Sequence, residues 1–281
     1  MEIFTDIKRS SEALESIYSK SEIRQIFRVF WEEKVGVSKA RSILNTWESI
    51  PNENLIDWKQ FIEQLLLGVP YQYALGFCYF CGHRIFVDQR VLIPRPETEE
   101  LVHYILDKIP ESGTGLDFGT GSGAIAIALK SKRQKWTFHA VDVSEGACTI
   151  AKHNARINEV QVELHCLDAL KDDFHELPNL DLIVSNPPYI PQIHHSTMDA
   201  LVVDHEPRIA LFVPDDDPFV FYRRIAEVAS IKLNAGGLVA VEIHYDGAKG
   251  VVDCFSSPIF TNVEIKTDIN GHERFVFARK C

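Results

Sequence analysis

The amino-acid sequence predicts an α/β protein in which a doubly wound, mostly parallel β-sheet with helices on both faces follows a small helical domain. Two observations support this fold class. Short apolar, strand-like runs alternate with helical stretches along the second part of the chain. A glycine-rich turn joins the first of these strands to its helix. The strand-like runs are residues 115–118, 138–143, 162–166, 180–185 and 238–243, and the helical stretches include 124–130 and 145–158.

Residues 1–70 are expected to form the small helical domain. Apolar side chains recur there at spacings of three and four residues, as in Ile23, Ile26, Phe27, Phe30 and Trp31. Farther along, Asp57 and Gln60 resemble a capping box at the start of a helix. Gly68 followed by Pro70 is typical of a helix end.

Residues 71–93 are predicted to form a β-hairpin that connects two domains. Aromatic and β-branched residues dominate this stretch, and Gly82 and His83 interrupt two short strand-like runs. Residues 94–281 then form the main domain.

The composition and charge of the chain limit its possible functions. With 281 residues, 46% of them hydrophobic and 25% charged, the chain has ordinary globular composition and enough material for two domains. The formal net charge is -11. A protein that binds many phosphates needs a basic surface, so we expect no extensive nucleic-acid surface.

Neither a membrane segment nor a metal site is expected. The first residues form no apolar leader, and no run has the length needed to span a bilayer, so we expect a cytoplasmic protein. Cys78 and Cys81 with His83 resemble half of a zinc site. Because no second ligand pair follows at the usual spacing, we predict no metal.

The stretch from Asp117 to Gly123 leaves a strand and enters a helix, as in nucleotide sites at the edge of a sheet. Glycines let the backbone come close to a ligand. A carboxylate just before the glycines would repel a phosphate but suits an ammonium group, so we expect Asp117 to bind the amino-acid part of a ligand. The other expected contacts are Gly119, Thr120, Gly121, Ser122 and Gly123.

Two further carboxylates follow the next strands. Asp142 is placed to accept hydrogen bonds from both hydroxyls of a ribose. Asp168 suits a contact with the adenine amino group, and Ala169 is expected to pack near the base. A ligand that joins adenosine to an amino acid without phosphate is S-adenosylmethionine, which becomes S-adenosyl-L-homocysteine after methyl transfer.

The turn Asn186-Pro187-Pro188-Tyr189 follows the fourth strand, where two prolines fix its shape. The Asn186 side-chain oxygen and the Pro187 carbonyl can accept both hydrogens of a substrate NH2, while the Tyr189 ring stacks on its plane. Such contacts make a delocalised amide or amine nitrogen more nucleophilic. We therefore expect Asn186, Pro187 and Tyr189 to be catalytic, Pro188 to bind substrate, and Asn186 to border the donor as well.

These motifs resemble the HemK/PrmC protein-(glutamine-N5) methyltransferases over nearly the whole chain. The resemblance includes Val91–Glu99, in which residues 93–99, Ile-Pro-Arg-Pro-Glu-Thr-Glu, are the most discriminating. The resemblance also covers Asp117 to Gly123, Asp142, Asn186 to Tyr189, Glu206-Pro207, Ala210-Leu211, Phe221 to Arg223, Gly236-Gly237, Glu242-Ile243 and Asp268 to Arg274.

The resemblance implies a Rossmann-like class I methyltransferase with a seven-stranded, mostly parallel sheet and S-adenosylmethionine as cofactor. It implies that the substrate is the glutamine of the Gly-Gly-Gln motif in peptide chain release factors, whose methylation modulates translation termination. The N-terminal helices would recognise the release factor. Arg95 to Thr98 would lie near the methionine end of the donor or the substrate entrance, with Arg95 and Glu97 binding substrate.

The chain departs from the family pattern at two places. Residues 213–219 replace a glycine-rich segment, and His244 follows Glu242-Ile243 where a glycine is more usual. These departures concern a loop and the end of a strand.

Two other functions fit parts of the pattern. An adenine-N6 or guanine-N2 methyltransferase of DNA or RNA presents the same exocyclic amine to Asn186 and Tyr189, but the acidic charge disfavours it. A regulatory module could bind S-adenosylmethionine without turnover, which the intact Asn186 to Tyr189 turn disfavours.

Overall fold

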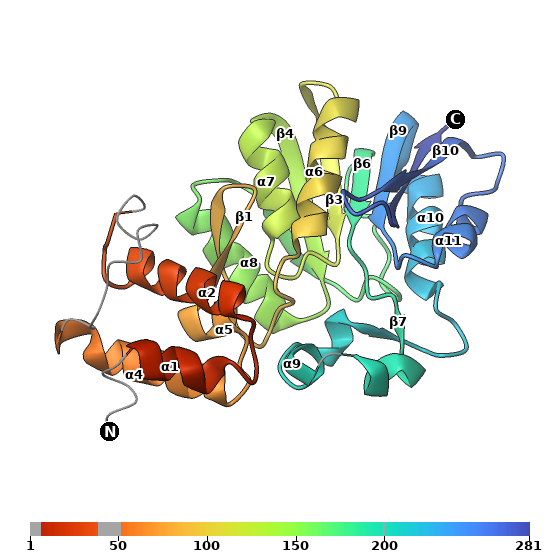
Figure 1. Cartoon of the computed structure of the whole chain (residues 1–281). Coiled ribbons are helices and arrows are strands. Elements are labelled where there is room, and N and C mark those ends of the chain that lie inside the picture. The colour runs from red at the N-terminus through yellow and green to blue at the C-terminus, as the bar shows by residue number, and fades with distance from the viewer. Residues whose placement is uncertain (1–6, 39–51, 199) are drawn as a thin grey trace. The chain divides into compact units, whose positions relative to one another are not determined.

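The computed structural model describes residues 7–38, 52–198 and 200–281. The chain divides into two compact units, Met1–Gly76 and Phe77–Cys281 (Figure 1). Among the described residues, no helix combines the length and the apolar character that crossing a membrane requires.

The first unit is helical in its described part. It contains α1 (Ile7–Leu14), α2 (Lys20–Glu33), a 3-10 turn η1 (Asn52–Asn54), α4 (Leu55–Leu66) and α5 (Tyr71–Leu75). Helix α2 begins with a complete capping box between Ser19 and Glu22. Its apolar face packs on α4, where the Phe27 and Phe30 rings lie 4.7 and 5.0 Å from the Trp58 ring.

Two details of the first unit differ from the sequence prediction. Asp57 caps no helix, because α4 already begins at Leu55 and Asp57 lies in its first turn. The division of the chain falls after Gly76, whereas the sequence suggests residue 70. The two boundaries differ because the short helix α5 follows Pro70 and belongs to the first unit. Gly76, in the left-handed conformation, caps the C-terminus of α5.

The second unit opens with an antiparallel hairpin of β1 (Phe77–Phe80) and β2 (His83–Phe86). Cys81 and Gly82 both have positive φ angles, 48° and 81°, as the tight turn of a twisted hairpin requires. The His83 ring bonds to the side chains of Ser131 and Asn158, at 2.8 and 3.2 Å. These bonds tie the hairpin to the helical layer of the same unit.

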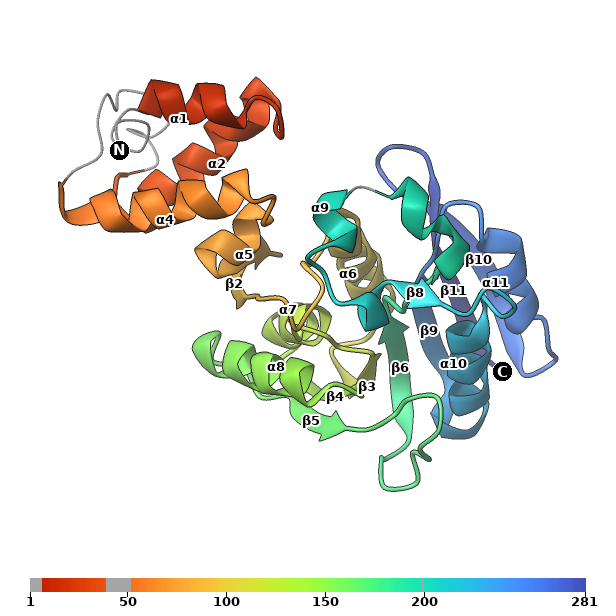
Figure 2. The same cartoon turned by 90° about the horizontal axis from the view of Figure 1, so that it is seen from below.

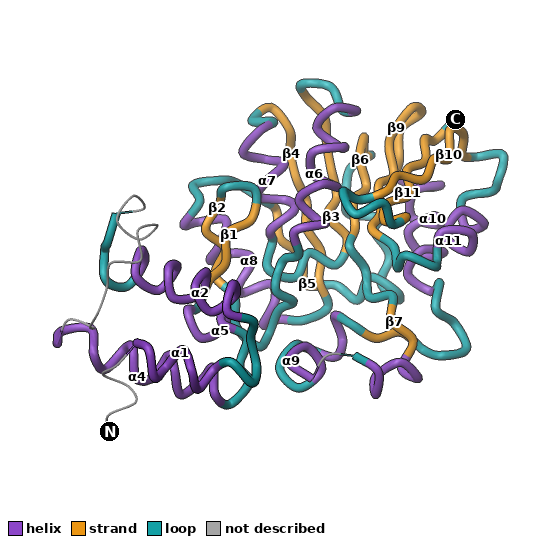
Figure 3. The backbone as a smooth tube through the Cα atoms, in the orientation of Figure 1, coloured by secondary structure: helices purple, strands orange, loops and turns teal. Residues whose placement is uncertain are grey.

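A seven-stranded sheet in the order β10-β11-β9-β6-β3-β4-β5 forms the centre of the second unit, which confirms the predicted fold class. Neighbouring strands from β9 to β5 run parallel, and β11 runs antiparallel to both β9 and β10. The strands are β3 (Ser112–Phe118), β4 (Lys135–Asp142), β5 (Glu163–Cys166), β6 (Leu180–Ser185), β9 (Leu233–Glu242), β10 (Phe260–Thr267) and β11 (Glu273–Lys280) (Figure 3).

Helices cover both faces of this sheet. Helices α6 (Pro96–Lys108), α7 (Ala124–Lys132) and α8 (Glu145–Ile157) pack next to one another, while α10 (Val220–Lys232) and α11 (Ala248–Cys254) form a second pair. The apolar core between α10, α11 and the sheet includes Leu116, Ile183, Val239, Ile225 and Phe255, each fully buried. Burial of such side chains is the main force that holds the layers together.

The chain reverses its direction of winding between β3 and β6. From β3 it proceeds outward to β4 and β5, then returns to β6 and continues to β9. Ligands of doubly wound sheets bind at such a switch point, outside the carboxyl ends of the strands. The glycine turn follows β3 and the Asn186 turn follows β6, so the fold brings the two main sequence motifs to one crevice.

The segment after Tyr189 lies at the end of the sheet where β6 finishes (Figures 1 and 2). It contains β7 (Ile190–Pro191), η2 (Gln192–Thr197), α9 (Ala200–Val203), η3 (Arg208–Ala210) and β8 (Phe212–Val213), with β7 and β8 paired in parallel. The unusual stretch 213–219 closes this segment. Asp215 there accepts a 2.8 Å bond from the backbone N–H of Ile193, and Asp217 pairs with Arg223.

Candidate functional site

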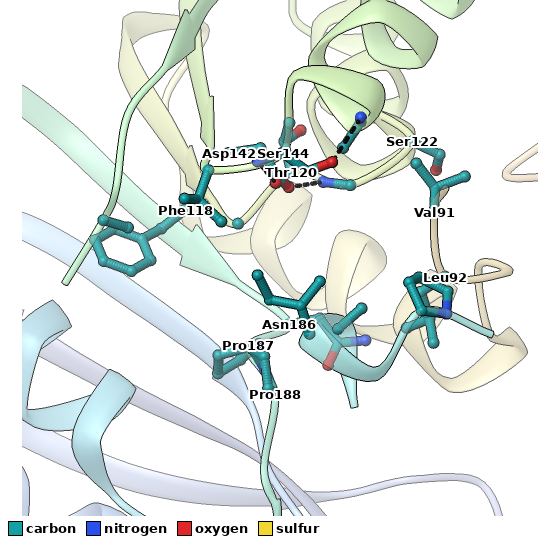
Figure 4. A pocket seen from close by; sticks show the side chains of 18 of the residues that line it. Val91, Leu92, Phe118, Thr120, Ser122, Asp142, Ser144, Asn186, Pro187 and Pro188 are labelled. Atoms are coloured by element: carbon teal, nitrogen blue, oxygen red, sulfur yellow. Dashed lines mark hydrogen bonds between the residues drawn. The ribbon is translucent and has the colours of Figure 1, made fainter. Parts of the chain in front are cut away.

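A cavity of about 290 Å³ lies at the carboxyl ends of β3, β4 and β6, entirely within the second unit. Asp142, Ser144 and Thr120 stand on one side of it, and Asn186, Pro187 and Pro188 on the opposite side (Figure 4). The cavity is mostly apolar, with a few polar groups, as is usual for small-molecule sites. The predicted residues that line it are Gly119, Thr120, Gly121, Ser122, Asp142, Asp168, Ala169, Asn186, Pro187 and Pro188.

The glycine turn takes a backbone shape that other residues adopt only with strain. Gly119 and Gly121 have φ angles of 76° and 54°, and a side chain at either position would meet nothing within 4 Å. The N–H groups of Gly119 and Thr120 both donate to the Val141 carbonyl. The turn is therefore fixed to β4 and leaves open space above the two glycines.

Gly123 has a different role in this turn. It does not line the cavity, but stands at the N-terminus of α7 with a φ angle of 83°. A Cβ atom at this position would lie 3.2 Å from the Ala151 Cβ on α8. Gly123 therefore permits close packing of α7 against α8, and its contact with a ligand stays a prediction.

Replacing Gly123 with alanine is expected to destabilise the protein by more than the roughly 1–2 kcal/mol that a left-handed non-glycine residue costs, because Ala151 also obstructs the new methyl group. Gly271→Ala is the matched control, since Gly271 has a φ angle of 85° and open space around it. Urea unfolding of both variants measures the difference. Equal losses for the two variants would contradict the packing role.

Asp117 lies beneath the glycine turn and does not line the cavity. Its Oδ2 atom accepts bonds from the Thr120 hydroxyl at 2.6 Å and from the Ala126 N–H at 3.3 Å. Its Oδ1 atom is buried without a partner among the described residues. Burial raises the pKa of this carboxyl group to about 7, against the lowering effect of its two donors. The direct contact with an ammonium group stays a prediction, and the contacts seen hold the turn in shape.

Asp142 is held by two backbone donors. Its Oδ2 atom accepts from the Gly121 N–H at 2.8 Å and its Oδ1 atom from the Ser144 N–H at 2.9 Å. Burial raises the pKa of Asp142, and these bonds oppose that rise. Each oxygen keeps a further lone pair for a ligand hydroxyl, so the predicted ribose contact fits this geometry.

Asp168 is less buried than Asp142. Its Oδ2 atom pairs with Lys171 at 2.8 Å and its Oδ1 atom accepts a hydrogen bond from the Leu170 N–H. The Lys171 contact lowers the pKa of Asp168. Ala169 is buried beside it. Both residues line the cavity, and their contact with the adenine end of a ligand stays a prediction.

The Asn186 side chain is part of a chain of hydrogen bonds that reaches into the protein. Its Nδ2 atom donates to the Thr98 hydroxyl at 3.1 Å, and that hydroxyl donates to Glu242 Oε2 at 2.7 Å. The Tyr189 hydroxyl lies 3.5 Å from Glu242 Oε1. Tyr189 itself is not among the described residues that line the cavity, so its stacking on a substrate stays a prediction.

Glu242 is the carboxyl group at the inner end of this chain of hydrogen bonds. It is buried, with 2% of its surface exposed. Burial raises its pKa from 4.5 to about 7, while the Thr98 hydroxyl lowers it. Sequence reasoning does not reveal this contact, because Thr98 and Glu242 are 144 residues apart. Glu242 occurs in the family motif, but no sequence signal shows that it faces Thr98.

The raised pKa of Glu242 predicts a pH-dependent stability. Because folding favours the protonated form, the stabilisation is complete below pH 4.5 and is lost as the pH rises through about 7. Glu242→Gln carries no such proton, so the wild-type free energy of unfolding should fall relative to this variant over that range. Urea unfolding at several pH values tests this, with exposed Glu176→Gln as control. A pH-independent difference between wild type and Glu242→Gln would contradict it.

Arg95 and Glu97 lie at the start of α6, and their surroundings differ. The Arg95 guanidinium pairs with buried Glu206 at 2.6 Å, and the other oxygen of Glu206 accepts from the Ile93 N–H. Glu97 is half-buried and close enough to raise the pKa values of Tyr189 and Glu242. Neither residue lines the cavity, and their substrate contacts stay predictions.

His244 and the cysteines complete the candidates from the sequence. His244 pairs with Asp246, and its ring lies 5.9 Å from that of Tyr189. Cys78 lies on β1 and Cys81 in its turn. Within residues 7–38, 52–198 and 200–281, no group of three or more His, Cys, Asp or Glu side chains is arranged to hold a metal.

Comparison with known sequences places this chain beside methyltransferases. The family model described as "Methyltransferase small domain" matches residues 97–205. Release factor glutamine methyltransferases of Flavobacterium psychrophilum and Bacteroides thetaiotaomicron are 35% and 34% identical to it. The first alignment covers 94% of both chains, and the second covers 96% of this chain and 97% of the other. The enzyme of that name from Streptococcus pneumoniae is 38% identical, over 83% of this chain and 89% of its own.

Solved structures with the same fold are more distant in sequence. A methyltransferase from Pyrococcus furiosus matches with a TM-score of 0.52 and 18% identity, over 71% of this chain and 89% of that one. A 16S rRNA methyltransferase of T. thermophilus, in complex with AdoMet and guanosine, matches with a TM-score of 0.50 and 15% identity. That match covers 73% of this chain and 50% of the other. At such identities the likeness concerns the fold, which is that of class I methyltransferases.

Proposed function

This chain belongs to the family of release factor glutamine methyltransferases, and from that premise we propose that it methylates the side-chain amide nitrogen (N5) of the glutamine in the Gly-Gly-Gln motif of peptide chain release factors. The methyl donor is S-adenosylmethionine. The observation that carries this proposal is that the glycine turn, Asp142 and the Asn186 turn line the same cavity.

The residues of the cavity fit S-adenosylmethionine. Asp142 offers two anchored oxygens for the ribose hydroxyls, and the open space above Gly119 and Gly121 admits a ligand backbone close to the turn. Asp168 and Ala169 hold the adenine end. When bound, S-adenosylmethionine supplies an electrophilic methyl carbon on sulfur, and transfer of that methyl to a nitrogen leaves S-adenosyl-L-homocysteine.

The Asn186 turn binds the reacting amide. Asn186 Oδ1 and the Pro187 carbonyl accept the two N–H groups of the glutamine side chain, and the Tyr189 ring and Pro188 border its plane. The lone pair of an amide nitrogen is delocalised, so these acceptors favour the conformation in which it can react. The N–H becomes acidic as the nitrogen gains positive charge, so one of its protons is released to water and no strong base is needed.

The remaining parts of the chain position the protein substrate. Arg95 and Glu97, at the start of α6, border the entrance for the loop that carries the glutamine. The helical unit that precedes the hairpin recognises the body of the release factor.

Transfer of a labelled methyl group from S-adenosylmethionine tests the proposed function. The purified chain is incubated separately with a release factor, with the same factor carrying alanine in place of the glutamine, and with pools of tRNA and DNA. Label is expected on the intact factor and not on the variant. Label on nucleic acid alone would replace the proposed substrate with an exocyclic base amine.

A further inference from the structure

Three elements of the second unit meet behind Asn186. Asn186 follows β6, Thr98 lies in the first turn of α6, and Glu242 is the last residue of β9. Thr98 and Glu242 are 4% and 2% exposed, so water does not compete for their hydrogen bonds. The bonds from Asn186 to Thr98 and from Thr98 to Glu242 are 3.1 and 2.7 Å long.

The direction of these bonds follows from the chemistry of the three groups. An ionised carboxylate can only accept hydrogen bonds, so the single hydroxyl hydrogen of Thr98 is donated to Glu242. The Thr98 oxygen can then only accept, and its neighbour in Asn186 must be the NH2 group. The opposite orientation of the Asn186 amide would place its carbonyl oxygen against the Thr98 oxygen, with no hydrogen between them.

We propose that Thr98 and Glu242 are positioning residues that fix the orientation of the Asn186 amide, so that its Oδ1 atom faces the substrate as an acceptor. This inference rests on the proposed function. A glutamine side chain presents an NH2 group and a carbonyl oxygen of similar size. An acceptor in the site selects the NH2 group, whereas a reversed Asn186 amide would bind the carbonyl oxygen and turn the nitrogen away.

Glu242 has further contacts that keep it in place. The Tyr222 hydroxyl donates to its backbone carbonyl at 3.0 Å, and the Tyr189 hydroxyl lies beside Oε1. The charged groups that act on its carboxylate are Arg274, Arg95 and Glu97. Arg95 is itself paired with Glu206, and Arg274 with Asp268. Glu242 is therefore held by neutral donors, and no ion pair to it is found among the described residues.

The decisive variants change the Thr98 hydroxyl alone. Thr98→Val keeps the shape of the side chain but removes the link between Asn186 and Glu242, and Thr98→Ser keeps the link. At about pH 8, we expect Thr98→Val to lower kcat on the release factor by about tenfold, the effect of losing one well-placed hydrogen bond. Thr98→Ser should stay close to the wild-type kcat. Thr98 also lines the cavity, so the affinity for S-adenosylmethionine is measured by calorimetry in both variants. In Thr98→Val we expect this affinity to change much less than kcat.

Two outcomes overturn the inference while leaving the proposed function intact. One is a wild-type kcat in Thr98→Val. The other is an equal loss of kcat in Thr98→Val and Thr98→Ser, which would indicate packing instead of orientation. Failure of the wild-type protein to methylate the release factor would instead contradict the proposed function itself.

The pH profile of kcat gives a second readout that packing alone would not move. When Glu242 is protonated it can donate to Thr98, so the direction of the bonds is no longer fixed. The wild-type kcat should therefore fall as the pH drops below about 7. In Glu242→Gln that fall should be smaller, because Glu242 no longer titrates while Asp117, whose pKa is also about 7, is unchanged. The same fall in Glu242→Gln would assign it to another group and contradict the role of Glu242.

Discussion

Replacing Asn186 with alanine is expected to lower kcat on the release factor by about a hundredfold or more, the usual effect of losing one positioned polar group in an active site. The Asn186 side chain is the polar group that faces the cavity from the turn after β6. Without it, the substrate NH2 group loses its side-chain acceptor and the nitrogen is no longer aimed at the methyl donor. Single-turnover kinetics with saturating S-adenosylmethionine measure this loss.

The affinity for S-adenosylmethionine separates this effect from misfolding. The glycine turn and Asp142 lie on the opposite side of the cavity, so calorimetry on Asn186→Ala should give nearly the wild-type dissociation constant (Figure 4). Asn186→Asp is a useful partner variant, because it keeps the size of the side chain but offers Thr98 no donor. Turnover close to wild type in Asn186→Ala would contradict its catalytic role.

Replacing Asp142 with alanine is expected to weaken the binding of S-adenosylmethionine by about a hundredfold, because two hydrogen bonds to a charged group are lost at roughly 1.5 kcal/mol or more each. The same substitution removes the acceptor of the Gly121 and Ser144 N–H groups. Turnover with saturating donor should fall much less than affinity. Calorimetry with the donor and its demethylated product measures the effect.

A ligand analogue distinguishes the ribose contact from a general loosening of the turn. S-adenosyl-L-homocysteine that lacks the ribose 2′-hydroxyl should bind the wild-type protein more weakly than the complete ligand. In Asp142→Ala the two ligands should bind alike, since the partner of the hydroxyl is gone. An equal penalty for the analogue in both proteins would contradict the assignment of Asp142 to the ribose.

Much of the sheet is predictable from local sequence. Strand β6 occupies Leu180–Ser185, as predicted, because a buried apolar run ends there at Asn186 and Pro187. Strands β3 and β9 start earlier than predicted, at Ser112 and Leu233. Their first residues include glycine, serine and asparagine, which have low strand propensity. Pairing with neighbours, such as Ser112 beside Lys135 and Leu233 beside Leu180, makes them strands nevertheless.

The site is predictable only in part. Its motifs lie in turns that the sequence reveals, but the residues that hold their side chains in place are distant in sequence. The glycine turn, Asp142 and Asn186 are visible in the sequence, since each follows a predicted strand. The partners of Asn186 and Arg95 are not visible: Arg95 meets Glu206 across 111 residues. Which carboxylate faces which donor depends on how α6 packs against the sheet, and periodicity and spacing carry no information about that packing.

Tandem mass spectrometry of the modified release factor shows directly which atom receives the methyl group. The factor is incubated with S-adenosylmethionine and either the wild-type chain or Asn186→Ala, digested, and sequenced by fragmentation. We expect one added methyl group on the side-chain nitrogen of the glutamine in Gly-Gly-Gln with the wild-type chain, and almost none with the variant. A methyl group on another residue, or equal modification by the variant, would contradict it.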